Sequence, residues 1–219
     1  MAPMDGVPAW VGLGANVGDA RATLEAAVRA LARLPDVHLG GVSRLYRTRP
    51  VGPVEQADFL NAVVELWLPQ AAADPQAAAL ALLVSLKGLE RAFGRREGER
   101  WGPRELDLDL LLFGTHRLLV ERPASGRSDD ASRSGVQWLE VPHPAAAERG
   151  FVLAPLADLA AQLEPPGWGL SVAEAAARAR TAEGPDAVLV VADWDATSGR
   201  WSAPKSTAAG IDRRGSPSQ

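Results

Sequence analysis

The segment RWGPRELDLDLL is the part of the sequence that most restricts how the chain can fold. Its second half predicts a strand in which Leu106, Leu108 and Leu110 bury one face, while Asp107 and Asp109 share the other. The Cα atoms of the two aspartates would stand roughly 6–7 Å apart, because a strand rises about 3.3 Å per residue. Ionised carboxylates that close repel each other unless a positive charge lies between them. The strand therefore carries either a solvated polar face near arginines or a hard-cation site.

The surrounding composition bears on this choice without deciding it. The chain has no Cys and three His, which disfavours a zinc site of the usual kind. Mg²⁺ is commonly held by one or two carboxylates together with substrate phosphates. Arginine forks suit phosphate oxygens, and arginine beside paired aspartate suits phosphoryl transfer. Four arginines come just before the Asp strand, although such a charge run is more often a solvated face: Arg95, Arg96, Arg100 and Arg104.

Length and charge exclude several classes of protein. The 219 residues are 47% hydrophobic and carry a net charge of −4, which opposes broad nucleic-acid affinity. We see no signal peptide, and no apolar run approaches the ~18 residues of a membrane span. We expect a cytoplasmic protein with no membrane or nucleic-acid partner.

Periodicity predicts strands over 8–13, 37–46 and 59–68, followed by the Asp strand. Helices are expected after Asp19 and Asp74, each of which can cap the first turn. This β-α-β-β-α-β order is that of a ferredoxin-like split βαβ unit. We expect an α+β fold with a mixed, mainly antiparallel sheet, helices on one face and a C-terminal helical appendage.

One domain is expected over residues 1–195. Within it, residues 121–138 are rich in Ser, Asp, Arg and Gly and predict a polar loop insertion. Ser171 opens a last helix with a capping box, and 187–194 can form a short strand. Residues 196–219 are expected to be a disordered tail.

Three smaller patterns keep two interpretations each. GLGANVGD can cradle a phosphate, but its final glycine is one place late for a dinucleotide fingerprint, so a tight turn fits as well. His143 lies between two prolines and can be structural or reach a phosphate. Phe59 and Phe151 can be core residues or can stack on a flat heterocycle, with Asn61 reading its polar edge.

Together these motifs resemble a known family. RWGPRELDLDLLLFG is similar to the signature of the 6-hydroxymethyl-7,8-dihydropterin pyrophosphokinases of folate biosynthesis. VGLGANVGD, SRLYRTRPVGP, QADFLNAVVEL, LERAFGRREGERWGPR and VPHPAAAERGFVLAPL follow in the family's order. The resemblance covers about residues 8–170.

The resemblance implies transfer of pyrophosphate from ATP to the hydroxymethyl group of 6-hydroxymethyl-7,8-dihydropterin, giving AMP. Asp107 and Asp109 would hold two Mg²⁺ ions bound with ATP, and Arg95 and Arg104 would complete the catalytic group. The implied pterin contacts are Gly14, Thr48, Val51, Phe59, Asn61, Trp101 and Phe151. The implied nucleotide contacts are Glu90, Arg96, Trp101, Arg104, Leu110, His143 and Arg149.

Departures from the family pattern keep an alternative open. Glu97 stands where the family commonly has Arg, Arg49 where Pro is common, and Pro144 where some members have Tyr. A non-catalytic pterin- or nucleotide-binding protein on the same scaffold is the second hypothesis. With ATP and the pterin as its partners, we expect the chain to act as a monomer.

Overall fold

The structure is a computed structural model that describes residues 6–50, 55–94, 102–127 and 135–204. Its helices and strands follow in the order β1 Val7–Ala15, α1 Ala20–Leu31, β2 His38–Val42, β3 Leu45–Thr48, β4 Phe59–Leu68, α2 Pro75–Ala92, β5 Asp107–Phe113, β6 Leu118–Glu121, β7 Trp138–Val141, α3 Gly150–Ala160, α4 Val172–Glu183, β8 Val188–Asp195 and β9 Arg200–Ser202. Short 3₁₀ turns lie at Pro69–Ala72, Ala124–Gly126 and Ala146–Glu148. The expected order of strands and helices is present, with β2 and β3 in place of one second strand.

The main sheet runs in the order β5-β1-β4-β3-β8-β9, and β2 also pairs with β4. The α+β class and the mainly antiparallel sheet are confirmed. The expected parallel component is not found, because every strand pair in the described residues is antiparallel. In this topology, two strands joined by a helix do point the same way. An antiparallel strand always lies between them. β4 separates β1 from β2, and β1 separates β4 from β5.

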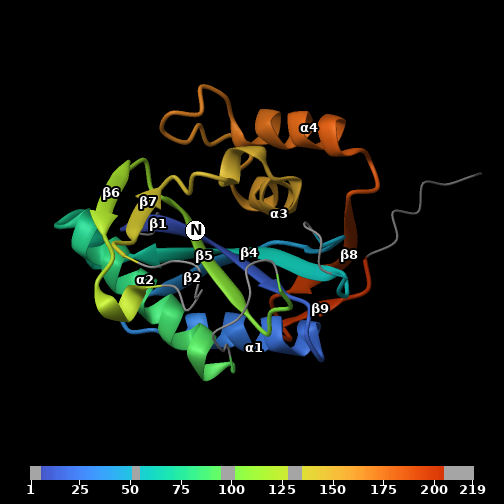
Figure 1. Cartoon of the computed structure of the whole chain (residues 1–219), viewed down its shortest axis with the longest axis horizontal. Helices are drawn as coiled ribbons and strands as arrows, with labels where there is room; N and C mark the ends of the chain where they lie inside the picture. The colour runs from blue at the N-terminus through green and yellow to red at the C-terminus, as the bar shows by residue number, and fades with distance from the viewer. Residues whose placement is uncertain (1–5, 51–54, 95–101, 128–134, 205–219) are drawn as a thin grey trace, which may run out of the picture.

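Helices cover both faces of the sheet, which corrects the expectation of one covered face (Figure 1). α1 and α2 lie on one side, and α3 and α4 on the other. The alternation in β4 supplies both cores. Val64 and Leu66 pack in the core that α1 and α2 share, while Val63 packs with Leu156 of α3. Because both faces of β4 are buried, the sheet is the middle of three layers.

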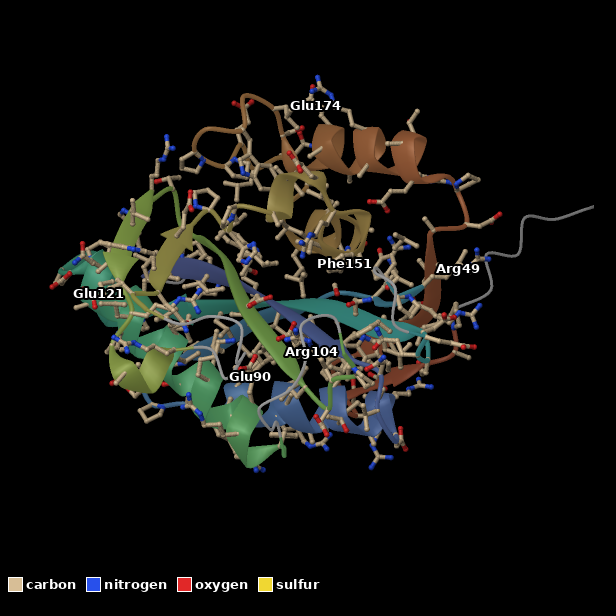
Figure 2. All side chains as sticks on the ribbon, viewed as in Figure 1. Arg49, Glu90, Arg104, Glu121, Phe151 and Glu174 are labelled. Carbon is tan, nitrogen blue, oxygen red and sulfur yellow. The ribbon has the colours of Figure 1, made fainter. Side chains whose placement is uncertain are left out.

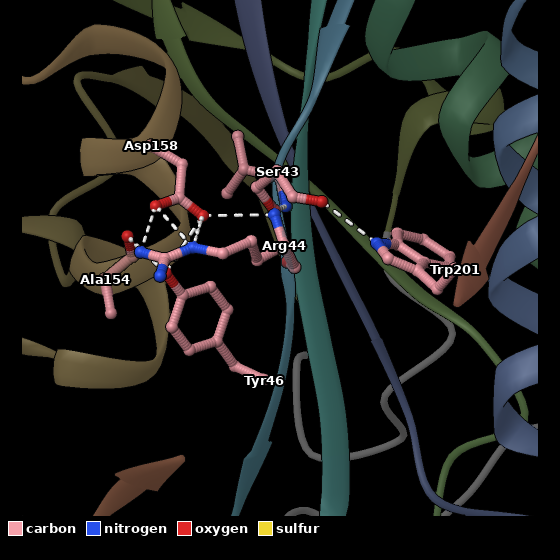
Figure 3. A network of polar contacts seen from close by, with 7 residues as sticks. Ser43, Arg44, Tyr46, Ala154, Asp158 and Trp201 are labelled. Carbon is pink, nitrogen blue, oxygen red and sulfur yellow. Dashed lines mark hydrogen bonds and ion pairs between the residues drawn. The ribbon is translucent and has the colours of Figure 1, made fainter. Parts of the chain in front are cut away.

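The predicted second strand is interrupted at Ser43 and Arg44. Ser43 Oγ accepts a hydrogen bond from the Val63 N–H (2.9 Å), between the β2 and β3 segments that pair with β4. Arg44 turns outward, and its guanidinium meets Asp158 of α3 with Nη2 to Oδ1 at 2.6 Å (Figure 3). Tyr46 adds a hydroxyl donor to the same carboxylate at 2.9 Å. These bonds attach α3 to the sheet beside the start of β3.

Burial and the neighbouring Asp158 carboxylate together raise the pKa of the Tyr46 hydroxyl well above its usual range. The hydroxyl therefore stays protonated near neutral pH and remains a donor to Asp158.

The chain beyond residue 195 is ordered as far as residue 204, so the expected disordered tail does not begin at 196. Trp201 of β9 is 3% exposed and stacks edge-on against Trp194. Its Nε1 donates to the Ser43 carbonyl oxygen at 2.9 Å (Figure 3), and its carbonyl accepts from Arg21 of α1. Burial of a large aromatic explains the order, since indole removes much apolar surface from water. Residues 205–219 lie outside the described residues.

The expected polar loop at 121–138 is structured at both ends. Glu121 and Trp138 pair across the β6–β7 hairpin, and Gly126 is buried against Leu83 of α2. Residues 128–134 lie outside the described residues. In the described residues, no helix is long and apolar enough to cross a membrane.

We expect Trp201→Ala to lower the free energy of unfolding by about 3–5 kcal/mol, the usual cost of truncating a buried aromatic. Urea unfolding followed by circular dichroism would measure the change. The matched control is Trp138→Ala, because that indole is 52% exposed and its loss should cost less than about 0.5 kcal/mol. Equal stability of the two variants would contradict an anchoring role for β9.

Candidate active site

A cavity of about 830 Å³ lies between the α3 face of the sheet, the start of α3 and the connection from α4 to β8. This size suits a small-molecule site. Eight residues singled out from the sequence line it: Gly14, Thr48, Phe59, Asn61, Arg104, Asp107, Arg149 and Phe151. Residues from four strands and one helix, far apart in the sequence, therefore meet in one cavity.

Gly14 of β1 lies between two of the polar groups. It pairs with Asn61 of β4 on one side and with Asp107 of β5 on the other. Two strand spacings of about 4.8 Å put these two residues roughly 10 Å apart on the cavity floor. A Cβ at Gly14 would lie 3.3 Å from Asn61 Oδ1. Glycine thus keeps the floor open between a carboxylate and an amide.

Asn61 is held in one orientation by its neighbour Thr48. Asn61 Nδ2 donates to Thr48 Oγ1 at 2.8 Å, and both residues are 7% exposed. Phe59 lines the cavity two residues before Asn61. Phe151 lies on the α3 side of the sheet (Figure 2), with the Arg149 guanidinium 5.7 Å from its ring centre. A flat ring between the two phenylalanines would meet an oriented amide at its edge.

Arg104 is fixed at the opposite end of the floor. Its Nη1 lies 3.1 Å from Asp107 Oδ1, within the turn that leads into β5. Its main chain exchanges two hydrogen bonds with Asn16, one at 2.8 Å and one at 3.0 Å. Asn16 also donates to Gln56 and to the Ala57 carbonyl oxygen. Asn16 therefore joins the Gly-rich turn after β1 to two distant segments, the one before β4 and the one before β5.

The Asp strand β5 is the edge of the main sheet, and two buried side chains of α2 cover that edge at Leu108. Glu90 Oε1 accepts from the Leu108 N–H at 2.7 Å, and Lys87 Nζ donates to the Leu108 carbonyl oxygen at 3.1 Å. Lys87 and Glu90 also pair with each other at 2.9 Å, at 4% and 1% exposure. Lys87 Nζ lies 4.0 Å from Asp109 Oδ1. Since Leu108 separates the two aspartates, this clamp fixes both.

This placement changes the interpretation of Glu90. It lies on the α2 side of the sheet, opposite Phe151 (Figure 2), and is buried in the clamp rather than on the cavity wall. Leu110 is 2% exposed and packs in the core shared with α1 and α2. Neither side chain lies at the surface of the cavity in this structure.

His143 lies beside β5 at a β-bulge. The ladder between β1 and β5 shifts register at Leu111, whose carbonyl oxygen accepts from the His143 N–H at 2.8 Å. His143 Nδ1 accepts from the Ala145 N–H at 3.3 Å. Burial lowers the pKa of the imidazole below its usual 6.5, against the opposing charge of Asp109. The neutral ring then carries its proton on Nε2, and this N–H can act as a donor.

Five of the residues singled out from the sequence lie outside the described residues: Val51, Arg95, Arg96, Arg100 and Trp101. Glu97, one of the three departures from the family pattern, is among the undescribed positions as well.

The aspartates fit the demands of Mg²⁺ bound together with phosphates. Among the described residues, no cluster of three or more His, Cys, Asp or Glu side chains could hold a metal alone. Asp107 and Asp109 supply two carboxylates on one face, with about half of the Asp109 side chain exposed. This donor set matches an ion that takes its remaining ligands from substrate phosphates and water.

Several side chains of the site were not singled out from the sequence. Lys87 is one of only two lysines in the chain, and it lies next to Leu86 on the buried face of α2. Asn16 lies in GLGANVGD, but its side chain bonds to Gln56, Ala57 and Arg104, which are 40, 41 and 88 positions away, and no local pattern indicated these partners. Glu183 and Asp186 line the cavity from the α4–β8 connection, and nothing local indicated that they would.

Comparison with known proteins places this chain in a family. Residues 10–161 match the family described as 7,8-dihydro-6-hydroxymethylpterin-pyrophosphokinase. The chain belongs to that family. Its activity is that of an ATP-dependent pyrophosphokinase of folate biosynthesis.

Relatives with this name support the assignment. The Pseudomonas aeruginosa 2-amino-4-hydroxy-6-hydroxymethyldihydropteridine pyrophosphokinase is 41% identical over 72% of the chain and 83% of the relative. The Bacillus subtilis enzyme of the same name is 38% identical over 71% of the chain and 80% of the relative.

A solved structure shares the fold of this pyrophosphokinase. Plasmodium falciparum HPPK-DHPS, wild type with SDX-DHP, matches with a TM-score of 0.65 at 14% identity, over 93% of the chain. The chain spans about half the length of that protein, 50%. At this identity the match supports the fold alone.

We expect Lys87→Met to lower the free energy of unfolding by about 3–5 kcal/mol, because it removes the ammonium group that lies 2.9 Å from the buried Glu90 carboxylate. Chemical unfolding would measure the loss. Adding Glu90→Gln keeps an acceptor for the Leu108 N–H and removes the buried charge that Lys87 balanced, so the double variant should regain much of the lost stability. No recovery in the double variant would contradict the clamp as the cause.

His143 makes stability depend on pH. Its pKa is lowered in the folded chain, so below about pH 6.5 the unfolded chain binds a proton that the folded chain does not. The free energy of unfolding should therefore be unaffected above this pH. It should fall by at most about 1.4 kcal/mol per pH unit as the pH drops toward 5.

Urea unfolding at a series of pH values would measure this slope. His143→Gln should remove it, whereas His38→Gln, at an exposed position of β2, should leave it. A slope that survives in His143→Gln would assign it to other groups.

Proposed function

We propose that the cavity on the α3 face is where this chain transfers pyrophosphate from ATP to the hydroxymethyl group of 6-hydroxymethyl-7,8-dihydropterin. The pairing of Gly14 with both Asn61 and Asp107 carries the proposal. It puts an edge-reading amide and a metal-binding carboxylate on one floor, about 10 Å apart by strand spacing. A flat bicyclic ring with a one-carbon arm can span this separation.

The pterin would lie between Phe59 and Phe151 with its polar edge toward Asn61. Thr48 supports this role, since it holds one amide hydrogen of Asn61 and leaves the rest of the amide for the ligand. The hydroxymethyl arm would then point along the floor toward Asp107. Val51 and Trp101 remain proposed pterin contacts from the family pattern.

The phosphate side would lie over β5. Arg104 and Arg149 supply guanidinium groups for phosphate oxygens, and neutral His143 supplies an Nε2–H donor. Arg95 and Arg96 are proposed to act with them. For Leu110, only a main-chain role toward the nucleotide suits its burial, and for Glu90 we propose the clamp on β5 in place of a nucleotide contact.

Asp107 and Asp109 would hold two Mg²⁺ ions, which neutralise phosphate charge and favour ionisation of the pterin hydroxyl when bound. The chain's own contribution is to orient the reactants. Held along the floor, the hydroxyl oxygen attacks the β-phosphorus of ATP in line with the bond to the α-phosphate. The new bond joins that oxygen to the β-phosphorus. AMP leaves with the bridging oxygen, and the hydroxyl proton is lost to solvent.

We propose further that the enzyme acts in the cytoplasm as a monomer. Its net charge of −4 and the absence of cysteine are compatible with a soluble protein of a reducing compartment.

Incubation with ATP, Mg²⁺ and 6-hydroxymethyl-7,8-dihydropterin should yield AMP only when the pterin is present. Asp107→Ala should reduce AMP formation by roughly 10²–10³-fold or more, as expected for loss of charge stabilisation at the reacting group. Asn61→Ala should raise the KM for the pterin more than the KM for ATP. Asp195→Asn, at the exposed turn between β8 and β9, is the matched control and should leave both unchanged.

Chromatography of the adenine nucleotides decides the outcome. ADP in place of AMP would mean transfer of a single phosphoryl group. Tight pterin binding without any product would favour the non-catalytic binding protein.

A further inference from the structure

The first turn of α3, which carries Phe151, is weakly held by its own sequence. In the described residues, Arg149 at the N-cap position gives no side-chain hydrogen bond to this helix. Pro155 lies inside the helix and has no N–H to donate to the carbonyl oxygen of Phe151, four residues earlier. An aromatic wall of the cavity therefore depends on support from elsewhere in the chain.

Glu183, the last residue of α4, supplies that support. Its Oε1 accepts from the Gly150 N–H at 2.8 Å, across 33 residues of sequence. An acidic residue at the C-terminus of a helix is unfavourable to that helix, whereas a carboxylate at the N-terminus of another is favourable. The position of Glu183 costs α4 some stability and caps α3. Gly150 fits the contact closely, because a Cβ there would collide with Glu183 Oε2.

The same connection forms part of the cavity. Residues 183–188 line it in one continuous stretch, and Val188 pairs with Thr48, which orients Asn61. Residues 183–188 all lie beyond residue 161, where the match to the family ends.

We infer that Glu183 is a positioning residue for the pterin: as a cap supplied by α4, it holds the first turn of α3 so that Phe151 faces Phe59 across the cavity. The inference rests on the proposed function for its ligand. The contact between Glu183 and Gly150 can be tested without any ligand.

Hydrogen exchange of the amides of residues 150–153 tests the cap in the free protein. Glu183→Ala should speed exchange of these amides, and Glu183→Gln, which keeps an acceptor oxygen, should restore protection. Gly150→Ala should also speed it by displacing Glu183, although alanine favours helix over glycine. Glu174→Ala is the matched control, since Glu174 completes the capping box at the other end of α4. Unchanged exchange in Glu183→Ala would overturn the inference.

Calorimetric titration with the pterin, at saturating Mg²⁺ and α,β-methylene-ATP, tests the consequence. Glu183→Ala and Gly150→Ala should weaken pterin binding by roughly fivefold, the factor that corresponds to loss of one helix cap. Binding of the ATP analogue should be unchanged, and Glu183→Gln should bind the pterin as the unaltered enzyme does. Equal weakening in Glu174→Ala would overturn the inference, since it would assign the effect to the stability of α4.

The two proposals fail in different ways. If the unaltered protein binds no pterin, the proposed function is wrong and the exchange experiment alone decides the cap. If it binds the pterin and Glu183→Ala binds it equally well, Glu183 has no positioning role.

Discussion

The clamp on Leu108 is the interaction on which the rest of the site depends. An edge strand leaves main-chain N–H and C=O groups without strand partners, and these groups must be satisfied where they are buried. Here Glu90 and Lys87 take the place of a neighbouring strand. Their charges cancel in a region too buried to tolerate either alone. The aspartates on both sides of Leu108 can then repel each other without moving the strand.

The opposite wall is also held by charged groups at helix ends and sheet edges. Asp158, in the last turn of α3, ties that helix to Arg44 and Tyr46 beside the break between β2 and β3 (Figure 3). Glu183 caps the start of the same helix. The cavity thus lies between a strand fixed at one residue and a helix fixed at two. Such a frame keeps its groups oriented before ligands arrive, which reduces the cost of ordering them on binding.

Sequence reasoning worked where the deciding physics is local. The periodicity of residues 59–68 predicted β4, and Asp19 and Asp74 cap α1 and α2 as expected. It failed where the partner is distant. The order of the segment around Trp201 depends on Ser43, 158 residues away, so a polar segment was mistaken for a disordered tail. The clamp by Lys87 and the cap by Glu183 were missed for the same reason, because their partners Leu108 and Gly150 are distant in the sequence.

By itself, the sequence determined the α+β class, the elements and the pair of aspartates on one strand face, because strand and helix periodicities are properties of consecutive residues. It also carried the motifs that indicate the family. Only the tertiary structure decided that both faces of the sheet are covered and that Gly14 lies between Asn61 and Asp107. It also decided which side chains fix the strand and the helix that bound the cavity. These features depend on which strands become neighbours and where helix ends meet, and such contacts join residues that the local pattern leaves independent.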